Sequence, residues 1–168
     1  MAKFIVKGPI EVPTKKQAGG GKHIDQSGVD KLVEKHATLE KMGCYIFSLK
    51  AGKGSKPLYV GKTARTIIKE AFSDRNRLYV GIKFSEHRRG TLQIWTITPV
   101  GRGRAPVNEI KDIEKEITEI ASIKNPDLIN TQNRAKKRNW SIEGVVQPKP
   151  GPRSTEAKGF RKMVGIGD

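Results

Sequence analysis

Residues 43–62 read GCYIFSLKAGKGSKPLYVGK, and this stretch decides the fold. Its first seven residues are rich in β-forming types and predict a strand over 43–49, and LYV at 58–60 predicts a short second strand. Between them, residues 50–56 are rich in Gly and Lys and have the composition of a turn. We therefore expect a β-hairpin with a long basic loop.

Other regular elements are expected on both sides of this hairpin. Upstream, Ser27 can cap a helix whose apolar stripe continues to Met42. Downstream, Thr63 is expected to open a second helix, residues 91–98 form the clearest strand, and Pro106 suits the first turn of a third helix. A hairpin followed by a third strand, with helices packed around it, makes a small α+β sandwich.

The length of 168 residues fits one domain with tails rather than two domains. We expect an N-terminal strand and a basic, Gly-rich arm over 1–26, one folded domain over 27–146, and a disordered basic tail over 147–168. Cys44 is the only cysteine, which excludes an internal disulfide and a cysteine-rich zinc site. No apolar run approaches the ~20 residues that span a bilayer, and the first residues turn charged too soon for a signal peptide, so we expect a cytoplasmic protein.

Charge is the strongest feature of the composition. The chain has 33 Lys and Arg against 17 Asp and Glu, a formal net charge of +16. Such an excess favours polyanions, because each cation that neutralises a phosphate releases condensed counterions. A solubilising surface, ribosome association and contact with anionic lipid are the alternatives. The expected partner is a nucleic acid, DNA first and RNA as the other option.

The tripeptide Gly61-Lys62-Thr63 also invites a phosphate-loop NTPase interpretation. That motif needs a glycine five residues before its second glycine, and this chain has Lys56 there. Residues 57–60 suit a strand rather than a loop of inward-facing amides. The NTPase interpretation is therefore rejected.

Two sets of polar residues stand out against the expected helices. On the second helix, Lys62, Arg65 and Lys69 fall on one face, which suits either a solvated surface or a phosphate clamp. On the third helix, Glu114 leaves from the edge of the apolar stripe, whereas Glu116 and Glu119 point further out to solvent. A partly buried carboxylate requires a cation or a donor, so both a lysine partner and a divalent metal fit Glu114.

Two short motifs and this glutamate helix resemble the GIY-YIG nuclease family. GCY at 43–45, with cysteine in place of isoleucine, resembles the first half of the family motif, and YVG at 59–61 resembles the second. Glu114 and the later PDLIN at 126–130 resemble the family's metal-binding glutamate helix and its trailing asparagine. The resemblance spans roughly residues 43–130 and implies a three-stranded antiparallel sheet flanked by helices, with 27–146 as the catalytic domain.

The resemblance also implies a chemistry, the hydrolysis of DNA phosphodiester bonds with one Mg²⁺ or Mn²⁺ ion. Glu114 would bind the metal. Tyr45 or Tyr59 would take a proton from the attacking water, and Lys62 would lower the pKa of that tyrosine. Supporting positions would be Gly43, Gly61 and Asn130. The expected nucleic-acid contacts are the basic residues Lys53, Lys56, Arg75, Arg77, Arg88, Arg89, Arg102 and Arg104.

The chain departs from the family pattern at the position of the family's helix arginine, which is Lys69 here. An ammonium neutralises a phosphate but cannot hold two oxygens in a planar fork, and Arg65, one turn earlier, is the candidate substitute. A catalytically impaired, GIY-YIG-like nucleic-acid-binding protein is therefore the main alternative to an endonuclease. A third alternative is an RNA-associated structural protein held through its basic arms.

Overall fold

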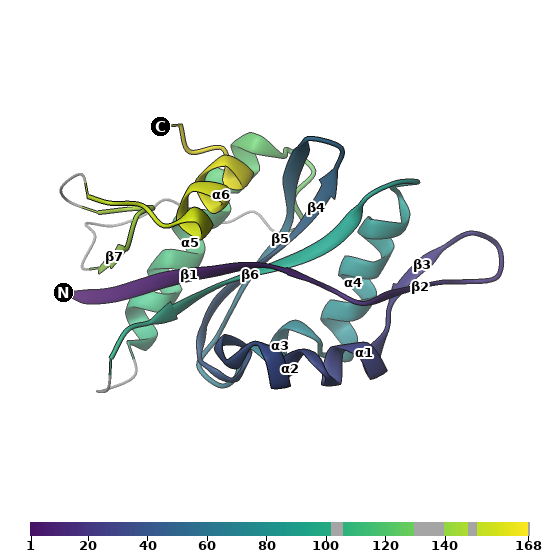
Figure 1. The fold of residues 1–168 in the computed structure, drawn as a ribbon, viewed down its shortest axis with the longest axis horizontal. Helices are drawn as coiled ribbons and strands as arrows, with labels where there is room; N and C mark the ends of the chain where they lie inside the picture. The colour runs from purple at the N-terminus through teal and green to yellow at the C-terminus, as the bar shows by residue number, and fades with distance from the viewer. Residues whose placement is uncertain (102–105, 130–139, 148–150, 168) are drawn as a thin grey trace.

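The computed structural model describes residues 1–101, 106–129, 140–147 and 151–167. Within these residues the chain forms a five-stranded sheet and a separate two-stranded sheet (Figure 1). The strands of the large sheet, in spatial order, are β5 (Gly54–Thr63), β4 (Gly43–Ala51), β6 (Thr91–Pro99), β1 (Ala2–Glu11) and β7 (Trp140–Ile142). All neighbours are antiparallel except β1 and β7. The small sheet pairs β2 (Thr14–Lys16) with β3 (Lys22–Ile24).

The expected three-stranded antiparallel sheet is therefore wrong. The strands β5, β4 and β6 are present, but β1 continues the sheet beyond β6 and β7 continues it beyond β1. Phe4 pairs with Pro99 and Ile10 pairs with Ile94, and both Phe4 and Ile10 are buried. The N-terminal strand is present as expected, but it belongs to the central sheet of the folded domain, because its apolar side chains complete both faces.

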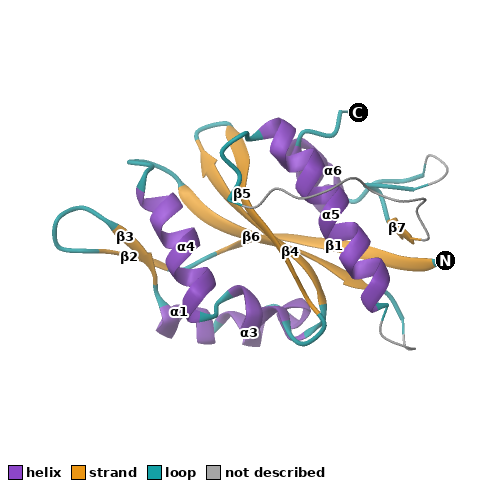
Figure 2. Ribbon diagram, turned by 180° about the vertical axis from the view of Figure 1, so that it is seen from behind, coloured by secondary structure: helices purple, strands orange, loops and turns teal. Residues whose placement is uncertain are grey.

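Helices cover the two faces of the sheet, each over its own hydrophobic core. One core packs the sheet against α5 (Val107–Lys124) and α6 (Thr155–Val164). The other core packs it against the helices α1 (Gln26–Asp30), α3 (Ile67–Ala71) and α4 (Asp74–Ser85) and the 3₁₀ turn η1 (Ala37–Glu40). Figure 2 shows α5 and α6 grouped together and apart from α1, α3 and α4. Strand β4 serves both cores, because alternate side chains of a strand point to opposite faces.

The helix expected from Ser27 to Met42 is broken into α1, α2 (Leu32–Lys35) and η1. The chain leaves the helical region at His36, where φ is −134° and ψ is 79°. The basic region after Ser73 contains α4. The Ser73 hydroxyl caps this helix by accepting a hydrogen bond from the Asn76 amide.

The expected disordered tail is also wrong, because α6 lies within it. Ser154 caps α6 by accepting from the Ala157 amide, and Gly165 ends it in the left-handed conformation at φ 87°. Phe160 and Met163 of this helix are buried in the core over α5. Residues 155–164 are therefore part of the folded domain. Among the described residues, no helix has the length and apolar character to cross a membrane.

Candidate active site

The two motif glycines lie where the backbone or an aromatic ring approaches closely. A Cβ on Gly43 would stand 2.1 Å from the Ile97 carbonyl oxygen of β6, so only glycine allows β4 to pair there. Gly61 faces Tyr45 across the β4–β5 ladder, and a Cβ on it would stand 2.4 Å from the Tyr45 ring. Gly61 thus lets the Tyr45 ring lie across β5.

The Tyr45 hydroxyl ends among polar partners although the side chain is buried. It accepts a hydrogen bond of 2.9 Å from the Asn76 side-chain amide, which also donates to the Glu70 carbonyl at 2.7 Å. A further hydrogen bond joins the hydroxyls of Tyr45 and Tyr59, whose ring centroids are 6.1 Å apart. Both motif tyrosines therefore belong to one hydrogen-bonded cluster, in which Tyr59 is the half-buried member. Asn76 is a member that the sequence analysis missed.

The environment of the cluster disfavours phenolate. Burial raises the pKa of Tyr45 far above its ordinary value, and the Tyr59 hydroxyl and the Glu70 carboxylate raise it further. Burial also raises the pKa of Tyr59, but the hydrogen bond with Tyr45 and the charge of Arg75 act in the opposite direction. Tyr59 is therefore the easier of the two to deprotonate. The cation near it is Arg75, on the first turn of α4.

Lys62 and Glu114 meet between β5 and α5. The Lys62 ammonium lies 2.6 Å from Oε2 of Glu114, and the two side chains are 38% and 19% exposed. Lys62 reaches α5 because it pairs with Cys44 in the ladder and so points to the face that α5 covers. After burial, the Glu114 carboxylate is a further cause that raises the pKa of Tyr59. The tyrosines pack in the core on the opposite face of the sheet from α5, so the ion pair and the tyrosine cluster are separated by the β4–β5 hairpin.

Two expectations about charged residues are wrong. Lys62 is in strand β5, Arg65 precedes α3 and Lys69 is on α3, so the three cations do not share a helix face. The ladder with β4 runs as far as Thr63, and this pairing keeps Lys62 extended. Glu116 is buried at 4% exposed rather than pointing to solvent.

The chemistry of Glu114 is compatible with one hydrated divalent ion. Magnesium keeps several waters and needs only one or two carboxylates. In the described part of the chain, no group of three or more His, Cys, Asp or Glu side chains forms a metal cage. Glu114 is partly exposed and its present partner, Lys62, is on a flexible, partly exposed side chain. Glu114 would hold the ion, and Lys62 would have to release at least one carboxylate oxygen.

The basic residues expected to contact nucleic acid fall into separate groups. Lys53 lines a cavity beside α6. Lys56, Arg88 and Arg89 line a second cavity on the other side of the β4–β5 turn. The α4 pair differs: Arg75 lies over the Tyr79 ring and Arg77 forms an ion pair with Asp74. Three further expected site residues, Arg102, Arg104 and Asn130, lie outside the described residues.

Asn125 is another residue that sequence reasoning missed. Its side-chain amide donates to the Pro57 carbonyl at 2.7 Å, and the Ile129 amide donates to the Leu58 carbonyl at 3.1 Å. These bonds fasten the segment after α5 to strand β5, next to Tyr59. A buried asparagine directly before a proline is the sequence signal that could have indicated this role.

No protein-family model matches the chain, and comparisons with curated proteins and with solved structures give no match either. The membership in the GIY-YIG family that the motifs indicate therefore stays a prediction.

Proposed function

We propose that the chain is a metal-dependent endonuclease that hydrolyses DNA phosphodiester bonds at the site formed by Tyr45, Tyr59, Lys62 and Glu114. The observation that carries the proposal is that strand β5 holds both Tyr59, which contacts Tyr45, and Lys62, which contacts Glu114. The four residues come from β4, β5 and α5, and they include a hydrogen bond between two hydroxyls and an ion pair of 2.6 Å. Core packing requires neither the two hydroxyls nor the ion pair on this hairpin, whereas phosphate chemistry needs a base, a cation and a carboxylate.

Tyr59 is the proposed general base. It is half-buried, so water can approach it, whereas Tyr45 is buried. Burial raises the pKa of Tyr59, and the hydrogen bond with Tyr45 and the charge of Arg75 partly oppose that rise. Lys62 would neutralise charge on the phosphate. A Mg²⁺ or Mn²⁺ ion bound at Glu114 would supply polarisation of the phosphate and neutralisation of the leaving oxygen.

The decisive test is plasmid nicking at low salt with Mg²⁺, Mn²⁺ or EDTA. Low salt is needed because the affinity of a basic protein for DNA falls steeply as salt rises. We expect wild type to nick in either metal and not in EDTA. The Glu114→Gln variant should lose at least about a hundredfold in rate, because the metal contributes several kcal/mol. Glu119→Gln is the matched control on the exposed side of α5 and should keep the wild-type rate.

A second function is favoured by the Lys62–Glu114 ion pair. Because the ammonium already satisfies the carboxylate, a nucleic-acid-binding protein without cleavage would need no metal at this site. That function predicts salt-sensitive retention of DNA with no nicking in any metal. In that case Lys69→Arg becomes the informative variant, since a planar guanidinium can hold two phosphate oxygens. Nicking gained by this variant would assign the loss of activity to position 69.

A further inference from the structure

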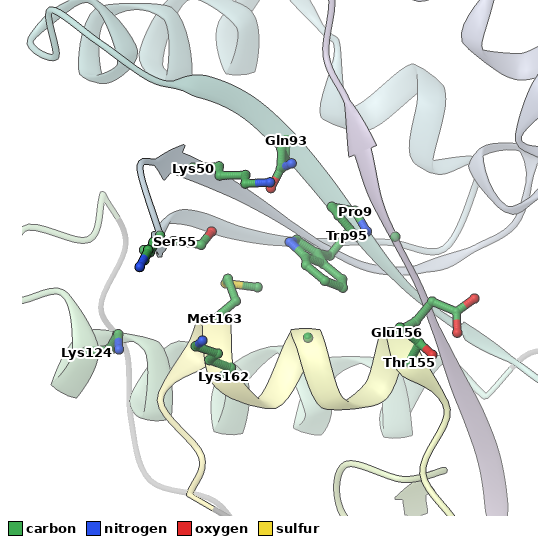
Figure 3. A pocket seen from close by; sticks show the side chains of 14 residues that line it. Pro9, Lys50, Ser55, Gln93, Trp95, Lys124, Thr155, Glu156, Lys162 and Met163 are labelled. Atoms are coloured by element: carbon green, nitrogen blue, oxygen red, sulfur yellow. The ribbon is translucent and has the colours of Figure 1, made fainter.

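A cavity of about 730 Å³ lies between the sheet and α6 (Figure 3). We call it the α6 cavity. Its walls come from β1, the β4–β5 turn, β6, the end of α5 and one face of α6. On α5, Lys124 at the cavity lies about 15 Å along the helix from Glu114. None of Tyr45, Tyr59, Lys62 and Glu114 lines it, so this is a second place on the molecule.

The sheet face under α6 changes from apolar to polar at this cavity. Along β4 the inward residues are Cys44 and Ile46, then Ser48 and Lys50, whereas the opposite face stays apolar. On β6 the corresponding residue is Gln93. A buried polar side chain is costly unless it has a partner. Ser48 is bonded to Trp95 and Lys50 is exposed, so Gln93 is the residue that requires an explanation.

Gln93 lacks such a partner in the part of the chain that the structure describes. It is only 8% exposed and it lines the cavity, yet its carboxamide has no hydrogen-bond partner among the described residues. Figure 3 shows the carboxamide turned toward the cavity, from the same face of the sheet as Lys50. A carboxamide that is open to the cavity offers two donors and an acceptor. It is therefore prepared for a polar ligand.

The charge at the α6 cavity is strongly positive. Four lysines line it, from the hairpin, α5 and α6: Lys50, Lys53, Lys124 and Lys162. Within the described ranges none of these four forms an ion pair with a carboxylate. The one acid of the lining, Glu156, pairs with Lys7 at 3.4 Å. Four unneutralised ammonium groups around one cavity favour an anion.

The opposite wall is apolar and fixed in place. Trp95 and Met163 form this wall, and Figure 3 shows their side chains directed toward each other. The Trp95 indole donates to the Ser48 hydroxyl at 3.1 Å, which holds the ring. Gly8 and Gly159 leave room for the ring, since a Cβ on either would stand about 3 Å from it. A planar apolar group therefore has a rigid surface to contact.

We propose that the α6 cavity binds a nucleotide. The phosphate lies among the lysines, the base contacts the apolar wall, and Gln93 hydrogen-bonds the edge of the base. The nucleotide is either free or part of a DNA strand, and the ligand chemistry is the same in both cases. The second cavity, lined by Lys56, Arg88 and Arg89, shares Ser55 and Lys124 with the first and would hold the next phosphates of a strand. This proposal does not depend on nuclease activity.

Isothermal titration of the full chain tests the proposal. The probes are the four deoxynucleoside monophosphates, the matching nucleosides, inorganic phosphate and a short oligonucleotide. We expect at least one monophosphate, or the oligonucleotide, to bind at least about tenfold more tightly than nucleoside or phosphate alone. Binding of the oligonucleotide only would identify a strand as the source. No binding by either, or equal affinity for phosphate alone, would overturn the proposal.

Variants that remove positive charge distinguish binding in the α6 cavity from general electrostatic attraction to a basic protein. Lys50→Gln with Lys162→Gln should weaken nucleotide binding at least about tenfold. The matched control is Lys111→Gln with Lys158→Gln, which removes the same charge from exposed positions on α5 and α6 outside the cavity. Equal weakening in the two double variants would contradict the proposal.

Two further variants test the recognition of the base and the independence of the two sites. Gln93→Leu keeps the side-chain volume and should reduce the difference in affinity between nucleotides, with the fold checked by circular dichroism. Unchanged discrimination in a folded Gln93→Leu variant would refute the role given to the amide. Glu114→Gln should bind nucleotide like wild type. Loss of nucleotide binding in that variant would contradict a separate site.

Discussion

Tyr45 combines a place in the core with a hydroxyl that is hydrogen-bonded at both of its sides. The ring packs edge-on against Phe47 with centroids 6.1 Å apart, and the hydroxyl contacts Asn76 and Tyr59. A buried hydroxyl with partners costs little, whereas the same hydroxyl ionised in this place would be expensive. The residue therefore stabilises the fold only while it remains protonated.

This property predicts a pH dependence of stability. The pKa of Tyr45 is raised in the folded state and is about 10 in the unfolded chain, so its contribution is complete below about pH 10 and is lost as the pH rises further. The loss should reach about 1.4 kcal/mol per pH unit. Urea unfolding from neutral to alkaline pH should show a wild-type decline that Tyr45→Phe lacks. The control is Tyr79→Phe, on the surface, and a decline equal in wild type and Tyr45→Phe would contradict the prediction.

At the scale of elements, β5 and α5 are joined at both ends of their contact. Lys62 and Glu114 join one end, and the bond from Asn125 to the Pro57 carbonyl joins the other. Strand β5 lies at one end of the strand order, with β4 as its only neighbour in the described part of the sheet. The side-chain bonds to α5 therefore position Tyr59, which lies between these two points on β5.

The ion pair predicts that the coupling free energy between Lys62 and Glu114 depends on whether a metal ion is bound. A double-mutant cycle of Lys62→Gln and Glu114→Gln, measured by urea unfolding in EDTA, should give a coupling free energy of about 0.5–1 kcal/mol. This value is modest because both side chains are partly exposed. In excess Mg²⁺ the coupling should fall, since a bound ion competes with the ammonium for the carboxylate. Equal coupling in EDTA and Mg²⁺ would show that Glu114 does not bind the metal, and the same cycle in Na⁺ at matched ionic strength controls for screening.

At the scale of the whole molecule, two cores share one sheet, and α6 closes one of them. Phe160 is fully buried and its ring packs edge-on against Trp95 with centroids 5.7 Å apart. The last described helix therefore completes a core that begins with Phe4 on the first strand. Removal of residues 148–168 would expose this core, so that deletion cannot test binding by the tail separately from folding.

The closing role of α6 gives a stability prediction. Phe160→Ala should lower the free energy of unfolding by about 3–5 kcal/mol, because it leaves a cavity under the helix. Lys158→Ala, exposed on the same helix, should change it by no more than about 0.5 kcal/mol. Urea unfolding measures both. A cost below about 1 kcal/mol for Phe160→Ala would mean that α6 does not pack in the core.

The sequence by itself determined the parts that depend on local pattern. The hairpin of β4 and β5, the strand β6 and the helix α5 follow from β-forming runs and helical spacing, which neighbouring residues encode. The sequence also indicated that Glu114 requires a partner, because its place on α5 follows from that spacing. The sequence left open whether that partner is a lysine or a metal ion. The structure pairs Glu114 with Lys62.

Only the tertiary structure decided which distant segments meet. Strand β1 pairs with β6 some ninety residues away, and α6 covers a face whose strands begin near residue 2. Local pattern cannot encode such pairings, since each depends on the surface that the other segments leave open. For the same reason Lys62, which the sequence places on a helix, lies in a strand. Its pairing with β4 outweighs its local helical tendency. Asn76 and Gln93 became candidate site residues only because folding placed them beside Tyr45 and beneath α6.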